Sequence, residues 1–253
     1  MANKIGFIAP VLTAAFLTGS ALAGVPGISG INGSADLRFD VDGFRDGINA
    51  SDQGEASLNV NAGDDPLPGG LFWSDTSVVE VDLGPTAGRI RSEAMFAASD
   101  QTFSYSQLVS GSGSVAEGDQ FAGNYDGMAN FFVNFDEPTL VDIVIRLTAT
   151  GPFVGDGTHA SVQVSGIGGQ GPITLEFTDG NPAGVQEFTI RTTIDSPRAL
   201  IFDFDANLDL NPDQGFPTEI GEIILFGSVS VVPGSGSLAL LGACGLLAAR
   251  RRR

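Results

Sequence analysis

The chain has 253 residues and a formal net charge of −18, from 30 acidic and 12 basic side chains. A protein this acidic repels nucleic acids and anionic lipid headgroups, so we expect no nucleic-acid partner. The single cysteine, Cys244, excludes an intramolecular disulfide and a cysteine-based zinc site, and with one histidine, His159, no histidine cluster can form.

The first 23 residues are typical of a secretory signal peptide. Lys4 supplies a positive charge, residues 5–17 form an apolar segment, and the small residues Ala21 and Ala23 have the spacing of a cleavage site. We therefore expect the export machinery to carry the chain across the inner membrane. The mature protein is expected to start at Gly24.

Residues 24–231 alternate apolar and polar side chains, which indicates half-buried antiparallel strands. In ITLEFT, for example, Ile173, Leu175 and Phe177 share one face and Thr174 and Glu176 the other. The dipeptides DG, GG, NP and PG mark turns between such segments. The other candidate strands in chain order are ADLRFDVDGF, ASLNVNAG, SVVEVDLG, TFSYSQLV, NFFVNF, TLVDIVIRLTAT, EFTIRTTID and GEIILFGSVSVV.

The fold class predicted for residues 24–231 is all-β, because outside the termini no helical periodicity extends beyond ten residues. Ten or more short strands favour an antiparallel, jelly-roll-like β-sandwich with the phenylalanines inside. The glycine- and serine-rich segment 109–127 lacks strong alternation and is either a long loop or a domain boundary. We favour a single acidic passenger domain.

An acidic run near the end of this domain has two interpretations. Its D-x-D-x-N start resembles a calcium-binding loop, but Leu208 replaces the glycine expected at the sixth position and Gln214 the glutamate at the twelfth. The acids also alternate with apolar residues, so we favour a solvated strand face and keep calcium as the alternative. The segment at residues 36–47 is interpreted in the same way. The candidate calcium ligands are Asp203, Asp205, Asn207 and Asp209.

The sequence contains no nucleophile, phosphate-loop or metalloprotease motif, so we expect no enzymatic activity. Trp73, together with Tyr105 and Tyr125, has the aromatic faces needed to stack on sugar rings, although Trp73 fits a core anchor better. We expect His159 to lie in an exposed loop.

The C-terminal segment 232–253 has three parts: a helix-breaking motif, an apolar stretch over residues 237–249, and an arginine cluster. As a helix the apolar stretch reaches only about 20 Å, short of the roughly 30 Å hydrocarbon core of a membrane. It therefore suits transient insertion, with the arginines held in the cytoplasm. The motif is Val232, Pro233, Gly234 and Ser235, and the cluster is Arg250, Arg251, Arg252 and Arg253.

This order of parts resembles the PEP-CTERM sorting signal of bacterial surface proteins. The resemblance implies recognition by an exosortase, a membrane-embedded transpeptidase-like cysteine protease, and a helical sorting segment. The usual Pro-Glu-Pro is here Pro233-Gly234-Ser235. A plain single-span tail anchor is the alternative interpretation.

Together these features predict an exported protein at the cell surface or in the extracellular matrix. A structural or adhesive role is the first hypothesis. The alternatives are a module that binds the exopolysaccharide of the matrix and, less favoured, a glycoside-active enzyme.

Overall fold

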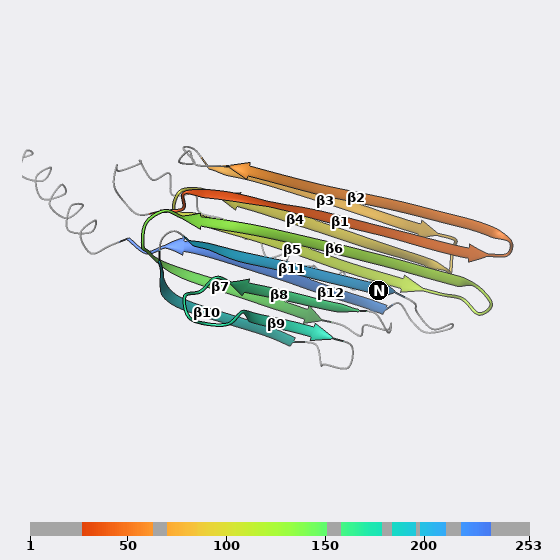
Figure 1. Cartoon of the computed structure of the whole chain (residues 1–253). Coiled ribbons are helices and arrows are strands. Elements are labelled where there is room, and N and C mark those ends of the chain that lie inside the picture. The colour runs from red at the N-terminus through yellow and green to blue at the C-terminus, as the bar shows by residue number, and fades with distance from the viewer. Residues whose placement is uncertain are drawn as a thin grey trace, which may run out of the picture.

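The structure is a computed structural model that describes residues 27–62, 70–150, 158–178, 184–195, 198–210 and 219–233 (Figure 1). These residues form twelve strands and no helix. The all-β prediction is thus confirmed. The strands are β1 (Gly30–Arg45), β2 (Ile48–Ala62), β3 (Leu71–Asp82), β4 (Ala87–Ala98), β5 (Thr102–Ser114), β6 (Gln120–Phe135), β7 (Thr139–Thr150), β8 (His159–Ser165), β9 (Ile173–Thr178), β10 (Gly184–Ile194), β11 (Arg198–Leu210) and β12 (Glu219–Val231).

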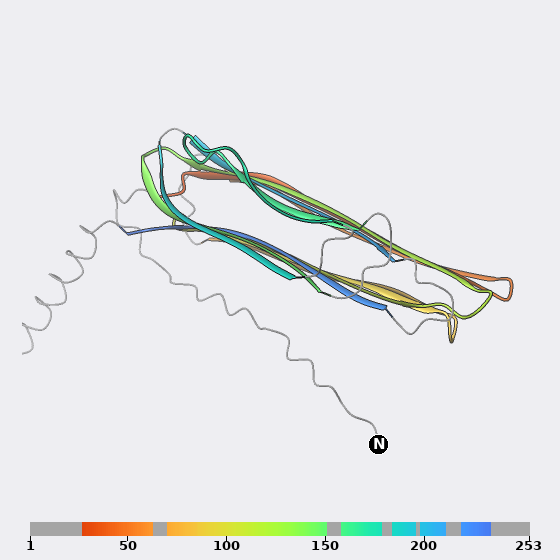
Figure 2. The same ribbon diagram turned by 90° about the horizontal axis from the view of Figure 1, so that it is seen from below.

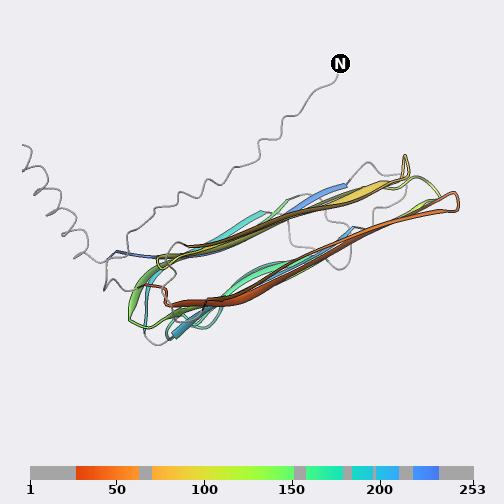
Figure 3. The same cartoon turned by 90° about the horizontal axis from the view of Figure 1, so that it is seen from above.

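The strands form two six-stranded sheets in which every pairing is antiparallel. Sheet A has the order β2-β1-β6-β11-β8-β9, and sheet B has the order β10-β7-β12-β5-β4-β3. Seen along their edges in Figures 2 and 3, the sheets lie over each other as two elongated layers. This arrangement is a β-sandwich, whose core is the layer of side chains between the sheets.

Strand β11 illustrates how the alternating sequence builds this core. Leu200, Phe202 and Phe204 point inward and are at most 2% exposed, whereas Asp203 and Asp205, which directly follow Phe202 and Phe204, lie on the solvent side. The period of two along a strand places alternate side chains on opposite faces of the sheet. The strand predicted for this acidic run is therefore confirmed.

The centre of the core is a cluster of aromatic rings from both sheets. Phe131 of β6 lies 5.3 Å from the ring centroid of Phe96, 5.5 Å from that of Phe103 and 5.0 Å from that of Tyr105. Phe131 belongs to sheet A and the other three to sheet B. These ring contacts therefore join the two layers.

A small polar network is buried beside this cluster. The Tyr105 hydroxyl donates to Oε1 of Gln107 over 3.0 Å, and the Gln107 amide donates to the Tyr125 hydroxyl across the sandwich. All three side chains are fully buried. Burial, the largest cause, raises the pKa of both tyrosines above the usual range.

The glycine- and serine-rich segment 109–127 is mostly strand rather than loop. It contains the end of β5, a short connection and the start of β6. A Cβ atom on Gly111 would lie 2.5 Å from Cδ1 of Leu210, so the larger side chains of the facing sheet fill the space that glycine leaves. Over residues 110–114 the glycines face inward and the serines face outward, so this stretch follows the alternation of a strand although its inward positions carry no apolar side chains.

Two side chains link the edge strands of the two sheets. Asp52 of β2 accepts a hydrogen bond from the Glu80 backbone N–H of β3 over 3.1 Å. At the opposite edge, the Gln186 amide of β10 donates to the Glu176 carbonyl of β9 over 2.8 Å. Each bond occupies a backbone group on an otherwise open sheet edge.

Candidate functional site

The solvent-facing side of sheet A, which we call the acidic face, carries an unusual concentration of carboxylates. Its side chains are mainly Asp, Asn, Ser, Gln and Thr, and Arg38 is the sole arginine at its outward-facing described positions. Strands β1 and β11 supply most of the charge, with three carboxylates each. The carboxylates at these described positions are Asp36, Asp40, Asp42, Glu55, Asp126, Glu176, Asp203, Asp205 and Asp209.

Antiparallel pairing arranges these side chains in rows that cross the sheet. Neighbouring strands lie about 4.8 Å apart, so hydrogen-bonding groups repeat at that spacing along each row. Met128, 62% exposed, lies in the middle of one row with Asp36 on one side and Asp205 on the other. This row spans all six strands and contains Ser57, Asp36, Met128, Asp205, Ser161 and Glu176.

The four candidate calcium ligands lie on β11 in this face. Asp203 accepts a hydrogen bond from the Asn130 amide, and Asp205 lies 3.1 Å from Nε2 of His159. Asn207 is paired with Asp126, while the Asp209 backbone N–H donates to Oγ1 of Thr158. In the described part of the chain, no three acidic, histidine or cysteine side chains come together as a metal-binding group. The extended backbone therefore favours the solvated-face interpretation over the calcium loop.

Removal of divalent cations is expected to leave the fold intact, because extended β11 separates successive outward carboxylates instead of gathering them around one ion. Thermal unfolding with EDTA should give the same Tm as with added calcium. The Asp203→Asn/Asp205→Asn variant should be equally indifferent to EDTA. A fall in Tm that added Ca²⁺ reverses would instead establish a structural calcium site.

The solvent-facing side of sheet B differs from the acidic face because several arginines balance its acids. Arg191 binds both carboxylate oxygens of Asp142, at 2.6 and 2.7 Å. The hydrogen bond from Arg191 lowers the pKa of Asp142 below its usual range. Arg146 pairs with a single carboxylate oxygen of Glu187, Oε2, and a third pair joins Arg91 to Glu93. The negative charge of the sandwich is thus concentrated on one of its two faces.

The histidine and the aromatic residues singled out in the sequence do not form a common site. His159 is the first residue of strand β8 and contacts Asp205, so the predicted loop placement is wrong. Tyr105 and Tyr125 are fully buried and cannot stack on a sugar. Trp73 points inward from β3 and packs, half-buried, against the core, as expected of a core anchor.

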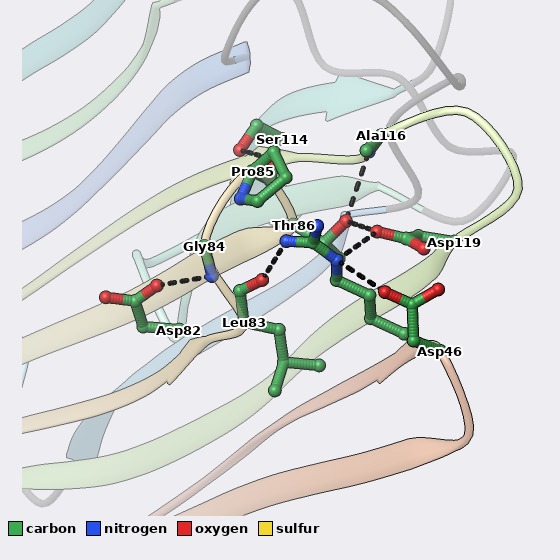
Figure 4. Close-up of polar contacts among 10 residues, drawn as sticks. Asp46, Asp82, Leu83, Gly84, Pro85, Thr86, Ser114, Ala116 and Asp119 are labelled. Carbon is green, nitrogen blue, oxygen red and sulfur yellow. Dashed lines mark hydrogen bonds and ion pairs between the residues drawn. The ribbon is translucent and has the colours of Figure 1, made fainter.

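At one end of the sandwich, side chains join the β1–β2 hairpin turn, the β3–β4 hairpin turn and the connection that leads from β5 in sheet B to β6 in sheet A (Figure 4). Arg45, from the end of β1, donates to the Leu83 carbonyl over 2.5 Å. Thr86 donates to Oδ2 of Asp119 and accepts from the Ala116 backbone N–H over 3.1 Å. Nε of Arg45 also lies 3.6 Å from Oδ2 of Asp119. We call Arg45, Thr86 and Asp119 the turn clamp.

The β1–β2 turn beside this clamp shows why its sequence forms a tight hairpin. Asp46 and Gly47 both have positive φ, at 51° and 82°, as a two-residue type I′ turn requires. Asp46 also lies 3.4 Å from Nε of Arg45. The Asp-Gly turn signal in the sequence is thus confirmed here.

Most of the residues predicted for export and sorting lie outside the described residues. These are Ala21, Ala23, Gly24, Gly234, Ser235 and Arg250 to Arg253. Val232 and Pro233 directly follow β12, where the Val232 backbone N–H donates to the Leu140 carbonyl over 2.8 Å. A search of the described residues for an apolar helix of membrane-spanning length found none.

Comparisons with known proteins give little further information. No family model matches the chain, and no curated protein matches it. Among solved structures, a similar chain is TmCBM61 in complex with β-1,4-galactotriose, with a TM-score of 0.24 and 11% identity. That match covers 67% of this chain and 91% of the other.

Proposed function

We propose that this chain is an exported structural or adhesive protein of a bacterial surface or extracellular matrix, and that it acts by binding rather than by catalysis. An exosortase-like enzyme sorts it through the segment 232–253. The acidic face is the surface that contacts extracellular polysaccharide. The second hypothesis is that the chain is a carbohydrate-binding module of the exopolysaccharide matrix.

The acidic face is the observation that supports a binding role. Hydroxyl-rich polysaccharides need donors and acceptors over an extended surface, and the face offers carboxylate, carboxamide and hydroxyl groups across six strands. Its excess of carboxylates disfavours strongly anionic chains. A face of this kind gains affinity from many weak contacts rather than from one deep pocket.

Loss of two carboxylates from the acidic face is expected to weaken polysaccharide binding. The Asp36→Ala/Asp205→Ala variant lacks two hydrogen-bonding groups of one row. Each hydrogen bond contributes roughly 0.5–1.5 kcal/mol, so the loss of both should raise the Kd for the polysaccharide about tenfold. Affinity electrophoresis in gels that contain exopolysaccharide from the native cells would measure the change.

The matched control is the Glu80→Ala/Glu222→Ala variant, which changes the net charge equally on the outer side of sheet B. Its Kd should stay within about twofold of the original, since its carboxylates lie on the other face. Equal losses in both variants would mean that overall charge, not the acidic face, governs retention. No retention of the unchanged protein would reject polysaccharide binding by this face.

The sorting proposal predicts that cells remove the C-terminal segment. Mass spectrometry of the protein from the cell surface should find a C-terminus near Val232 to Ser235, because this motif follows the last strand, β12, directly in the chain. Pro233 is exposed at the end of the described residues. Recovery of an inner-membrane form that retains Arg250 to Arg253 would instead support the plain tail anchor.

A further inference from the structure

A cavity of about 520 Å³ opens at the end of the sandwich that carries the turn clamp. It is bordered by β1, β2, β6 and the connection between β5 and β6. Its volume lies within the range of roughly 300–1,000 Å³ that is typical of small-molecule sites. We call it the end pocket, and it is separate from the rows in the middle of the acidic face.

The end pocket combines an aromatic ring with amide groups on both sides. Phe44, at the end of β1, is 38% exposed and lies opposite Asn49 on β2 and Gln120 on β6 in the paired strands. Both amides line the cavity with Phe44. An aromatic ring can stack on the apolar C–H face of a pyranose, while amides donate to and accept from its hydroxyl groups.

Deeper in the pocket, a carboxylate is held in place from behind. Asp119 lines the cavity and is only 7% exposed. Oδ2 of this residue accepts from Thr86 and faces Arg45, so the turn clamp fixes the position and orientation of the carboxylate. A binding group that is already ordered loses little entropy when a ligand arrives.

The charge of the end pocket selects among sugars. Asp42 and Asp119 line it, and no lysine or arginine is among its described lining residues. The nearby Arg45 already contacts Asp119, Asp46 and the Leu83 carbonyl. The carboxylate of a uronic acid would therefore be repelled by two carboxylates and would find no cationic partner among the lining residues. The hydroxyl groups of a neutral sugar can instead donate to these carboxylates, and the ammonium group of an amino sugar also gains an ionic contact.

We propose that the end pocket binds a single neutral or amino-sugar residue of a polysaccharide, stacked on Phe44 and hydrogen-bonded by Asn49, Gln120 and the clamped Asp119. The end pocket lies at one end of the acidic face and shares Asp42 with it, but this inference does not need the row that contains Asp36 and Asp205. The face provides extended contact, and the end pocket provides selection of the sugar.

Isothermal titration of the full chain with three tetrasaccharides tests the proposal: tetraglucosamine, cellotetraose and tetragalacturonate. We expect the first two to bind, with tetraglucosamine tighter at low salt, and tetragalacturonate to bind at least about tenfold more weakly. Equal or tighter binding of tetragalacturonate would overturn the proposal, as would the absence of binding by both of the other sugars.

Variants then locate the binding. Phe44→Ala and Gln120→Ala should each raise the Kd for the tetrasaccharide that binds about tenfold without changing the Tm. Phe72 is an exposed phenylalanine on sheet B, so Phe72→Ala should leave the Kd unchanged. Ala122→Trp, which fills the cavity at an exposed position, should abolish binding in a folded protein. Unchanged affinity in Phe44→Ala and Ala122→Trp would overturn the proposal.

The Asp36→Ala/Asp205→Ala variant separates this inference from the proposed function. Its affinity for the tetrasaccharide should be that of the unchanged protein, because both residues lie outside the end pocket. Loss of polysaccharide retention with intact tetrasaccharide binding therefore supports both proposals. Loss of tetrasaccharide binding in this variant would place the sugar on the acidic face and overturn the end-pocket assignment.

Discussion

Phe131→Ala is expected to lower the free energy of unfolding by about 3–5 kcal/mol, the usual cost of removing a buried phenylalanine ring. Phe131 is fully buried and its ring contacts the aromatic rings of Phe96 and Tyr105 in the facing sheet. The change therefore removes apolar contact between the layers and leaves a cavity between them. Thermal or urea unfolding measures the loss, which corresponds to roughly 6–20 °C in Tm.

The adjacent residue provides the control for this experiment. Phe132 is 40% exposed on the outer side of the same strand, so Phe132→Ala should cost less than about 1 kcal/mol. The two variants remove the same ring from neighbouring positions on opposite faces. Similar losses of stability in both would show that the centre of the core does not lie at Phe131.

Gln107→Leu is expected to destabilise the protein by about 2–4 kcal/mol, although leucine is apolar and of similar size. The substitution removes the partner of both Tyr105 and Tyr125, so two buried hydroxyl groups lose a hydrogen bond. Each buried polar group left unsatisfied costs about 1–3 kcal/mol. Urea unfolding provides the measurement.

Removal of the remaining hydroxyls should restore much of that stability. Combining Gln107→Leu with Tyr105→Phe and Tyr125→Phe leaves no unsatisfied polar side chain of the three, so the triple variant should be more stable than Gln107→Leu alone. If the triple variant is less stable than Gln107→Leu, the loss of stability in Gln107→Leu does not arise from the tyrosine hydroxyl groups that lose their hydrogen bond.

Alkaline pH provides an independent readout of the same network. The folded-state pKa of both tyrosines is raised, so their contribution to stability is complete below the unfolded-state pKa of about 10 and is lost as pH rises further. Because the chain has only these two tyrosines, tyrosinate absorbance should appear together with unfolding rather than before it.

The strands predicted most completely from the sequence are those with large apolar residues at most inward positions. The β7 segment, with Val141, Ile143 and Ile145 all fully buried, is an example. Strand β4 was missed, because glycine, serine and alanine occupy several of its inward positions. A Cβ on Gly88 would overlap the ring of Phe121 from the facing sheet. The small inward residues of β4 thus make sense only once the opposite layer is known.

The candidate sites divide in the same way. Alternation correctly placed the acids near Asp36 and Asp203 on solvated strand faces, since this depends only on local periodicity. Their position on one shared face depends on β6 lying between β1 and β11, which no local pattern encodes. The end pocket was missed for the same reason, because Phe44 and Gln120 become neighbours only through strand pairing.

The bonds made by Asp52 and Gln186 affect how copies of the protein behave when they are crowded. An unprotected sheet edge can accept a strand from another molecule, and repetition of that step produces a fibre. Here the Glu80 N–H and the Glu176 carbonyl are already bonded, and Asp52 adds a negative charge at its edge. These two side chains therefore favour a sandwich that remains a finite particle, even at the high local concentrations of a surface layer.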